Sequence, residues 1–178
     1  MFNRVAVLTA LTLLAPATLA GGAGMPMTPG MSTAQMTNDS DVLFMEVATM
    51  SNLAEISTSR LALQRSSNAA VRAYAQRMIT EHTMAQAQLN QIAASKGVKL
   101  TDKPGADQRL QANKLATLSG AAFDRMYKMV QVQGHQMTLD LIVMYRTLGR
   151  DQAALAYAAK MQPAVEMHLM DAKALPVQ

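Results

Sequence analysis

The stretch that decides the fold runs from Asn68 to Gly97 and reads NAAVRAYAQRMITEHTMAQAQLNQIAASKG. Apolar residues recur in it every three or four positions, which is the spacing of one face of an α-helix. Asn68 is a typical N-cap residue and Gly97 a typical helix stop, so one long helix is predicted over 69–96. The apolar stripe also carries a histidine, His82, which is therefore expected to face the core. The stripe consists of Val71, Ala75, Met78, His82, Ala85, Leu89 and Ile92.

The same helical period appears on both sides of this stretch. It predicts long helices over residues 40–65, 120–148 and 151–174, and a short one over 106–117. Only the connection 97–119 is long, and two helical hairpins joined by one long crossover is the connectivity of ferritin-like bundles. No alternating strand pattern competes with this interpretation. The expected fold is therefore an all-α, ferritin-like four-helix bundle.

Composition limits the chemistry that this bundle can carry. Half of the 178 residues are hydrophobic and 16% are charged, which excludes an intrinsically disordered chain. There is no Cys, which excludes disulfides, thiolate nucleophiles and iron–sulfur sites, so a metal would need His, carboxylate or Met ligands. The net charge of +4 is not clustered, and no nucleic-acid partner is expected.

The N-terminus has the features of a cleaved secretory signal peptide. Arg4 supplies a positive charge before the apolar run 5–14, and small residues end at Ala20, after which we expect cleavage. Residues 21–39 are predicted to form a flexible leader rich in Met, Gly and Pro, and residues 40–175 are predicted to form the bundle. An uncleaved membrane anchor is the less favoured alternative, because spanning a bilayer takes about 20 apolar residues and the apolar run 5–14 is shorter. A periplasmic or secreted protein without a transmembrane segment in its mature chain is predicted.

Several short motifs make the chain similar to a known family. They are Asn52–Ile56, Asn68–Met78, Glu81–Thr83, Leu118–Arg125, His135, Asp140, Pro163 and His168–Leu169. Over about residues 41–175 the chain resembles an exported bacterial family of unknown function, whose members are often labelled predicted outer membrane proteins and assigned a ferritin-like fold. The resemblance implies a helical bundle outside the cytoplasm and no established activity. The chain departs from the family pattern at Gly134 and Ser57, where acidic residues are common, and so lacks two possible metal ligands.

The three histidines and Glu55 lie at similar levels of the predicted bundle. At 1.5 Å per residue from their hairpins, all four fall near the middle of helices about 40 Å long. His82 and His168 belong to core stripes, whereas His135 lies one position from the strongest stripe of its helix. Glu55 flanks the stripe of the first helix among small residues. Two of the expected core stripes are Leu43, Val47, Met50, Ala54 and Leu61 on the first helix, and Phe123, Tyr127, Val130, Gly134, Met137, Leu141, Met144 and Leu148 on the third.

A carboxylate-bridged di-iron site is not expected in this chain. Such a site requires Glu-x-x-His on two helices, so that both ligands point inward one turn apart. Glu81 and His82 are adjacent, and Glu166 lies two residues from His168. We therefore expect no ferroxidase activity and no enzyme of another common class, because Gly-rich phosphate loops, nucleophile elbows and His-Glu-x-x-His motifs are absent from the sequence.

Two interpretations of the inward histidines remain open. One is a single transition-metal ion, Cu, Fe or Zn, held by His82 and His168 with His135 and Glu55 as further ligands, in an envelope or stress context. The other is that these are core histidines, hydrogen-bonded to neighbouring side chains. Inward histidines at matching levels favour the first interpretation, and the small number of ligands favours the second.

Methionine provides a second, weaker candidate metal site. Four of the 16 methionines lie in the leader, where thioether ligands would select Cu(I): Met25, Met27, Met31 and Met36. The alternative is that these four residues reflect chance in a Met-rich chain. Most of the methionines in the predicted helices are interpreted as core-filling residues. A different hypothesis follows from the helix 120–148, which is apolar on more than one side: a structural or interaction module that forms a homodimer or docks on an envelope protein.

Overall fold

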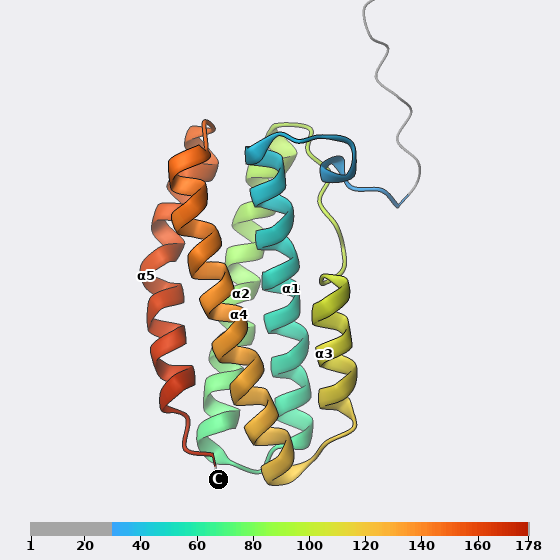
Figure 1. Ribbon diagram of the computed structural model, residues 1–178, viewed down its shortest axis with the longest axis vertical. Helices are drawn as coiled ribbons and strands as arrows, with labels where there is room; N and C mark the ends of the chain where they lie inside the picture. The colour runs from blue at the N-terminus through green and yellow to red at the C-terminus, as the bar shows by residue number, and fades with distance from the viewer. Residues whose placement is uncertain (1–29, 178) are drawn as a thin grey trace, which may run out of the picture.

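The structure is a computed structural model that describes residues 30–177, and within that range it is all-helical (Figure 1). A short 3₁₀ helix, η1, precedes five α-helices. Their bounds are η1 Thr33–Met36, α1 Ser40–Arg65, α2 Ala69–Ser95, α3 Ala106–Ala116, α4 Gly120–Leu148 and α5 Gln152–Ala174. The predicted helix boundaries are correct to within one residue.

Local capping explains this agreement. The side chain of Asn68 accepts hydrogen bonds from the backbone N–H groups of Ala70 and Val71, and Asp151 accepts one from Ala154. Gly97 has a φ of +65°, the left-handed conformation that ends α2 at little cost for a glycine. Ser119 occupies the N-cap position of α4, but its side chain makes no capping hydrogen bond.

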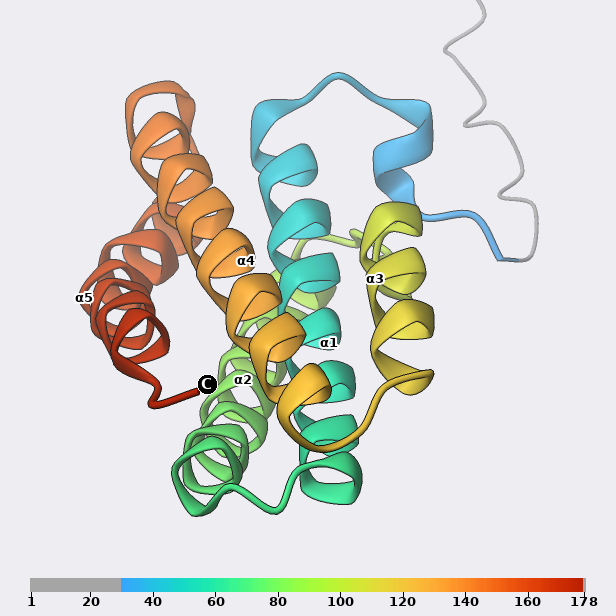
Figure 2. The same cartoon turned by 60° about the horizontal axis from the view of Figure 1, so that its bottom comes forward.

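The four long helices lie side by side (Figures 1 and 2). α1 packs along α2 and α4 along α5, which makes two hairpins, and the hairpins meet through the pairs α1–α4 and α2–α5. The crossover between the hairpins runs through α3, which lies along the outside of α1. α1 therefore touches three neighbouring helices and has buried residues on nearly every side.

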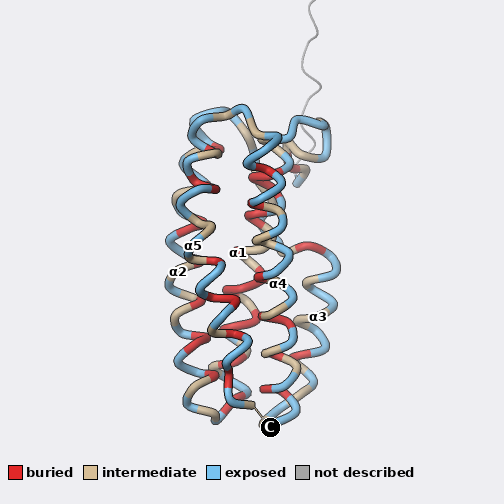
Figure 3. Tube along the Cα trace, turned by 60° about the vertical axis from the view of Figure 1, so that its left-hand side comes forward, coloured by how far each residue is buried: buried red, intermediate tan, exposed pale blue. Residues whose placement is uncertain are grey.

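Buried residues recur along all the long helices (Figure 3), and the apolar ones form two core clusters. One includes Phe44, Leu89, Ile142 and Tyr157; the other includes Met78, Phe123, Tyr127 and Ala172. Between them, near the middle of the helices, lies a layer of buried polar residues. It comprises Asn52, Glu55, Thr58, Ser59, His82, Gln86, Gln131, His135 and His168. Polar groups are costly to bury unless they are hydrogen-bonded, so this layer is where a function is to be sought.

Two of the predicted core stripes are correct only in part: Phe123, Tyr127 and Val130 on α4 and Ala54 on α1 are buried, but several other members are exposed. On α4, Met137, Met144 and Leu148 are 63%, 54% and 53% exposed, and the buried face instead carries Gln131 and His135. On α1, Leu43 and Val47 are exposed, and their neighbours Phe44 and Ala48 are buried. The buried faces of α1 and α4 also carry residues of the polar layer. A pattern of apolar residues alone does not identify such a face as buried.

The end of the predicted flexible leader also differs. Thr33 exchanges two hydrogen bonds with Lys99, its N–H donating to the Lys99 carbonyl and its Oγ1 accepting from the Lys99 N–H. This fixes η1 to the loop after α2. The predicted signal peptide, Met25 and Met27 lie outside the described residues. Within residues 30–177, no helix is both long enough and apolar enough to cross a membrane.

Candidate metal centre

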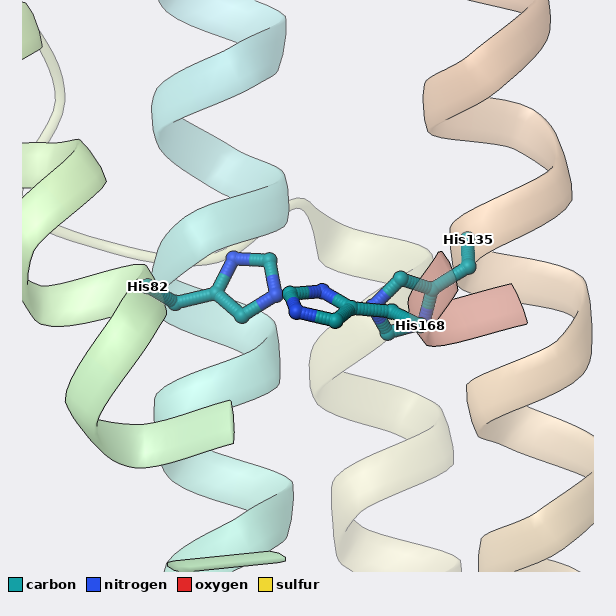
Figure 4. A group of neighbouring side chains, drawn as sticks. All are labelled: His82, His135 and His168. Carbon is teal, nitrogen blue, oxygen red and sulfur yellow. The ribbon is translucent and has the colours of Figure 1, made fainter. Parts of the chain in front are cut away.

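Three helices each bring one histidine to the polar layer: His82 on α2, His135 on α4 and His168 on α5. All three are buried. Their ring centroids are 5.3–5.5 Å apart, and one ligand nitrogen from each lies within 4.8 Å of the other two. Figure 4 shows the three rings turned toward one another. The structure thus assembles residues that are 33 to 86 positions apart in the chain.

Each imidazole has one nitrogen facing away from the cluster, and each of these outer nitrogens has an acceptor. His82 Nδ1 is 2.9 Å from Asn52 Oδ1, and His168 Nε2 is 2.5 Å from Glu81 Oε2. His135 Nδ1 lies 2.9 Å from the backbone carbonyl of Gln131, one turn earlier on α4. A carbonyl oxygen can only accept, so His135 carries its proton on Nδ1.

The Asn52 amide is oriented by its own neighbours. Its Nδ2 donates to Gln86 Oε1 at 3.0 Å and to the Tyr157 hydroxyl at 3.2 Å, which uses both of its N–H groups. Asn52 Oδ1 is therefore the atom left to face His82, and it can only accept. His82 consequently donates from Nδ1 and keeps the lone pair of Nε2 free.

The inner nitrogens have no hydrogen-bond partner. They are His82 Nε2, His135 Nε2 and His168 Nδ1, all buried. An unsatisfied buried donor or acceptor costs about 1–3 kcal/mol, and three lone pairs facing one another add mutual repulsion. Native cores rarely leave such groups together, because most buried polar atoms are paired. A cation between them would satisfy all three.

The environment of His82 and His168 favours the neutral form of their imidazoles. Burial lowers the pKa of His82 well below its ordinary value of 6.5, and the proximity of His135 and His168 lowers it further. Burial also lowers the pKa of His168, against the opposing effect of its hydrogen bond to Glu81. Neutral imidazole is the form that binds a metal, so protons do not compete for these nitrogens near neutral pH.

Glu55 lies on the outer side of His135 and not among the inner nitrogens. Its Oε1 is 3.7 Å from His135 Nδ1, beyond hydrogen-bonding distance, and its buried Oε2 has no partner. Burial raises the pKa of Glu55, although His135 and Gln131 partly offset this. Gly134 leaves the space for this carboxylate, since a Cβ there would lie 2.9 Å from Glu55 Oε1.

The spacing of the cluster suits one ion after a small contraction. The centre of a triangle with 4.8 Å sides lies about 2.8 Å from each corner, whereas imidazole–zinc bonds measure about 2.0–2.1 Å. Each ring must therefore move inward by at most about 0.7 Å. Three imidazoles leave at least one coordination position open, the arrangement typical of sites that bind water or a further ligand.

Sequence reasoning missed the groups that hold the histidines. Helical spacing showed that Glu81 points away from the stripe of His82, which is so, but it could not show that Glu81 contacts His168 on another helix. Asn52 and Gln131 were not singled out. One sequence pattern could have pointed to these groups: Asn52 and Glu55 lie on one face of α1 beside small residues, at the level of His82.

The described methionines of the leader lie elsewhere. Met36 is 45% exposed in η1, and Met31 is half-buried just before it. α1 begins at Ser40, about 22 Å along the helix axis from Glu55 at 1.5 Å per residue. Met31 and Met36 are therefore not part of the histidine cluster.

Comparison with known proteins identifies a family without an assigned activity. A family model described as a domain of unknown function (DUF4142) matches residues 26–175. No curated protein and no solved structure matches the chain.

Proposed function

This chain belongs to the DUF4142 family, a domain of unknown function, and we propose that it binds one transition-metal ion through His82, His135 and His168. The observation that carries this proposal is the convergence of three buried imidazole nitrogens without partners, each on a ring whose other nitrogen is held by an acceptor. Carbonyl or carboxylate acceptors behind metal-binding imidazoles are a recurring feature of metal sites.

The ligand set favours particular ions. Neutral imidazoles suit Zn, Cu and Fe, and the chain has no thiolate to favour softer ions. Glu55 lies 3.7 Å from the outer nitrogen of His135, close enough to balance part of the charge of an ion, so its role in this proposal is that of a supporting group. The leader methionines remain a second candidate site, specific for Cu(I).

A purely structural role for the histidines is the competing interpretation. It accounts for the three outer hydrogen bonds, two of which join α1 to α2 and α2 to α5, while the third lies within α4. It leaves the three inner nitrogens unpaired in a layer that apolar residues could have filled. Metal binding explains both sets of nitrogens, which is why we prefer it.

Metal analysis of the purified protein tests the proposal. We expect about one ion per chain after expression in metal-supplemented medium, and loss of most of it in His82→Ala and His168→Ala. Glu166→Gln, a change at an exposed carboxylate of α5, serves as the control and should retain the ion. Helical circular dichroism spectra verify that the variants are folded. Equal metal contents in all four proteins would refute the proposal.

The wider setting is part of the same proposal. We assign the domain at 40–175 to the ferritin-like bundles, on the support of its two hairpins and its crossover through α3. We also propose export to the periplasm or envelope, on the support of the signal-like sequence up to Ala20. Mass spectrometry of the protein from a periplasmic fraction tests export, and an intact Met1 would contradict it.

An interaction module of the envelope is the second candidate function. The exposed apolar side chains of α4 support it, since Met137, Met144 and Leu148 lie along one helix. Light scattering after size-exclusion chromatography distinguishes a monomer from a homodimer, and Met137→Gln with Met144→Gln should dissociate a dimer formed through this face. A wild-type monomer that captures no envelope protein would rule this candidate out.

A further inference from the structure

A cavity of about 560 Å³ adjoins the histidine cluster. All four long helices contribute to its wall, and most of the lining is apolar, from Phe44 and Ala48 on α1 to Ile142 on α4 and Val165 on α5. Its volume lies in the range of about 300–1,000 Å³ that is usual for small-molecule sites. A mostly apolar space of this size is expected to bind an organic molecule.

The two histidines that line the cavity lie at one end of it. On α1 the lining runs from Phe44 to Asn52, and on α5 it runs from Tyr157 to His168. Asn52 and His168 are the last lining residues of their helices, and on α2 the lining begins at Glu81 and His82. His82 and His168 therefore form the floor of the cavity, which extends about 12–16 Å from them at 1.5 Å per residue and carries the polar residues Gln88 and Lys160 away from this floor.

The cavity reaches the surface between α2 and α5. Met84 on α2, close to the level of His82, is 67% exposed, and Lys160 on α5, about 12 Å along the helix from His168, is also exposed. Lys160 Nζ donates to Gln88 Oε1 at 2.9 Å, which links the two helices beside this entrance. Met161 and Ala164 of α5 line this space and are half-buried.

We propose that this cavity binds a monocarboxylate with a slender apolar tail, whose carboxylate occupies the coordination position that the three histidines leave open. The inference rests on the proposed metal site. Imidazole binds a metal as a neutral ligand, so three histidines bring no anion to a divalent ion, whereas a carboxylate is an anionic oxygen ligand that supplies one. The apolar wall then takes the hydrocarbon tail, each buried methylene adding up to about fourfold in affinity.

Metal dependence follows from the charges at the floor. Without an ion, a carboxylate at the floor would meet the side chain of Glu81 and the imidazole rings and would have no ion to coordinate. With an ion bound, it would become a ligand. A neutral alcohol of the same length should gain much less from the ion, so the head group and the tail can be tested separately.

Isothermal titration calorimetry with the purified full-length protein tests this inference, using decanoate, acetate and 1-decanol as probes. We expect decanoate to bind the Zn²⁺-loaded protein at least tenfold more tightly than the EDTA-treated protein. Acetate should bind at least 100-fold more weakly than decanoate, because it lacks the tail. The affinity for 1-decanol should change less than threefold between the two forms.

A matched pair of substitutions locates the binding. Ala85→Leu fills the cavity from the buried face of α2 and should weaken decanoate binding at least tenfold, whereas Ala87→Leu, on the exposed face of the same helix, should leave it unchanged.

Zinc content is measured in each protein, which separates the two proposals. Zinc bound without saturable decanoate binding would overturn this inference and leave the metal site standing. Equal decanoate affinity with and without zinc would overturn the carboxylate–metal contact, and absence of zinc would overturn the proposed function itself.

Discussion

Asn52 and Glu81 illustrate how single residues prepare the candidate site. Neither faces the inner nitrogens, yet each accepts from the outer nitrogen of a histidine and thereby leaves a lone pair on the inner one. Asn52 is in turn oriented by Gln86 and Tyr157. The site is thus built from a layer of supporting hydrogen bonds as much as from its three candidate ligands.

Removing these acceptors should weaken metal binding without abolishing it. We expect Asn52→Leu and Glu81→Gln to lower zinc affinity about 10–100-fold, the usual effect of losing an outer-shell partner. Asn90→Ala, which removes an amide acceptor from the exposed face of α2, should change it by less than twofold. Competition with a fluorescent zinc chelator measures all three. Wild-type affinity in Asn52→Leu would show that the tautomer of His82 does not depend on Asn52.

Metal-free stability should decrease in mild acid because of His82 and His168. Their pKa values are lowered in the folded protein, so below about pH 6.5 the unfolded chain binds protons that the folded chain does not. The free energy of unfolding then falls as the pH drops, by at most about 1.4 kcal/mol per pH unit and group. Glu55, whose pKa is raised, acts in the opposite direction above pH 4.5, since its folded form retains a proton that the unfolded form has lost.

Urea unfolding in EDTA at pH 7.5 and 5.5 measures this dependence. His82→Gln should lose less stability than the wild type over the same interval, because it lacks one of the groups that the unfolded chain protonates. A steeper loss in the variant would contradict the assigned direction of the His82 shift.

At the scale of single helices, the sequence signals that mark helix ends differ in strength. Asp39 accepts hydrogen bonds from the backbone N–H groups of Asp41 and Val42 and so caps α1. Ser119 stands at the equivalent position of α4 without such a bond. The residue type alone cannot distinguish these two cases, because capping depends on the side-chain rotamer and on the approach of the chain.

Asp39→Ala should therefore cost about 1 kcal/mol of unfolding free energy, and Ser119→Ala close to none. Urea denaturation followed by circular dichroism at 222 nm measures both. A loss in Ser119→Ala as large as that in Asp39→Ala would mean that Ser119 caps α4 in solution.

The helix faces show where periodicity succeeds and where it fails. The predicted stripe of α2 is confirmed, with six of its seven members buried and Ile92 half-buried. The stripes of α1 and α4 were correct only in part, because the buried faces of these helices also carry the polar layer. From the sequence alone, a polar residue on a buried face is interpreted as exposed. Its hydrogen-bond partners lie on other helices and become known only from the tertiary structure.

On the scale of the whole molecule, the candidate site joins the two hairpins. His82 belongs to the first hairpin, and His135 and His168 belong to the second, so an ion would connect elements that only folding brings together. The polar layer interrupts the apolar core at this level. A bound ion would strengthen the fold where apolar packing is absent.

Zinc should accordingly stabilise the folded protein by mass action. At a free concentration 100 times its dissociation constant, a ligand that binds only the folded state adds about 2.7 kcal/mol to the free energy of unfolding. Urea unfolding with and without zinc should show this increase in the wild type and not in His82→Ala. An equal increase in both proteins would place the stabilising ion at another site.

The sequence by itself determined the helices, their ends, the level at which the histidines lie and the inward facing of His82 and His168. These properties are local: they depend on residue spacing, capping and the rise per residue. The absence of Cys, also visible in the sequence, limited the possible ligands.

Only the tertiary structure decided which side chains meet. It brought His135 to the other two histidines, set Glu81 against His168, placed Glu55 outside the cluster and opened the cavity above it. The physical reason is that the rotation of one helix against another depends on packing at several interfaces at once. For α1 and α4 this packing buries a polar layer, which no periodic pattern within a single helix encodes.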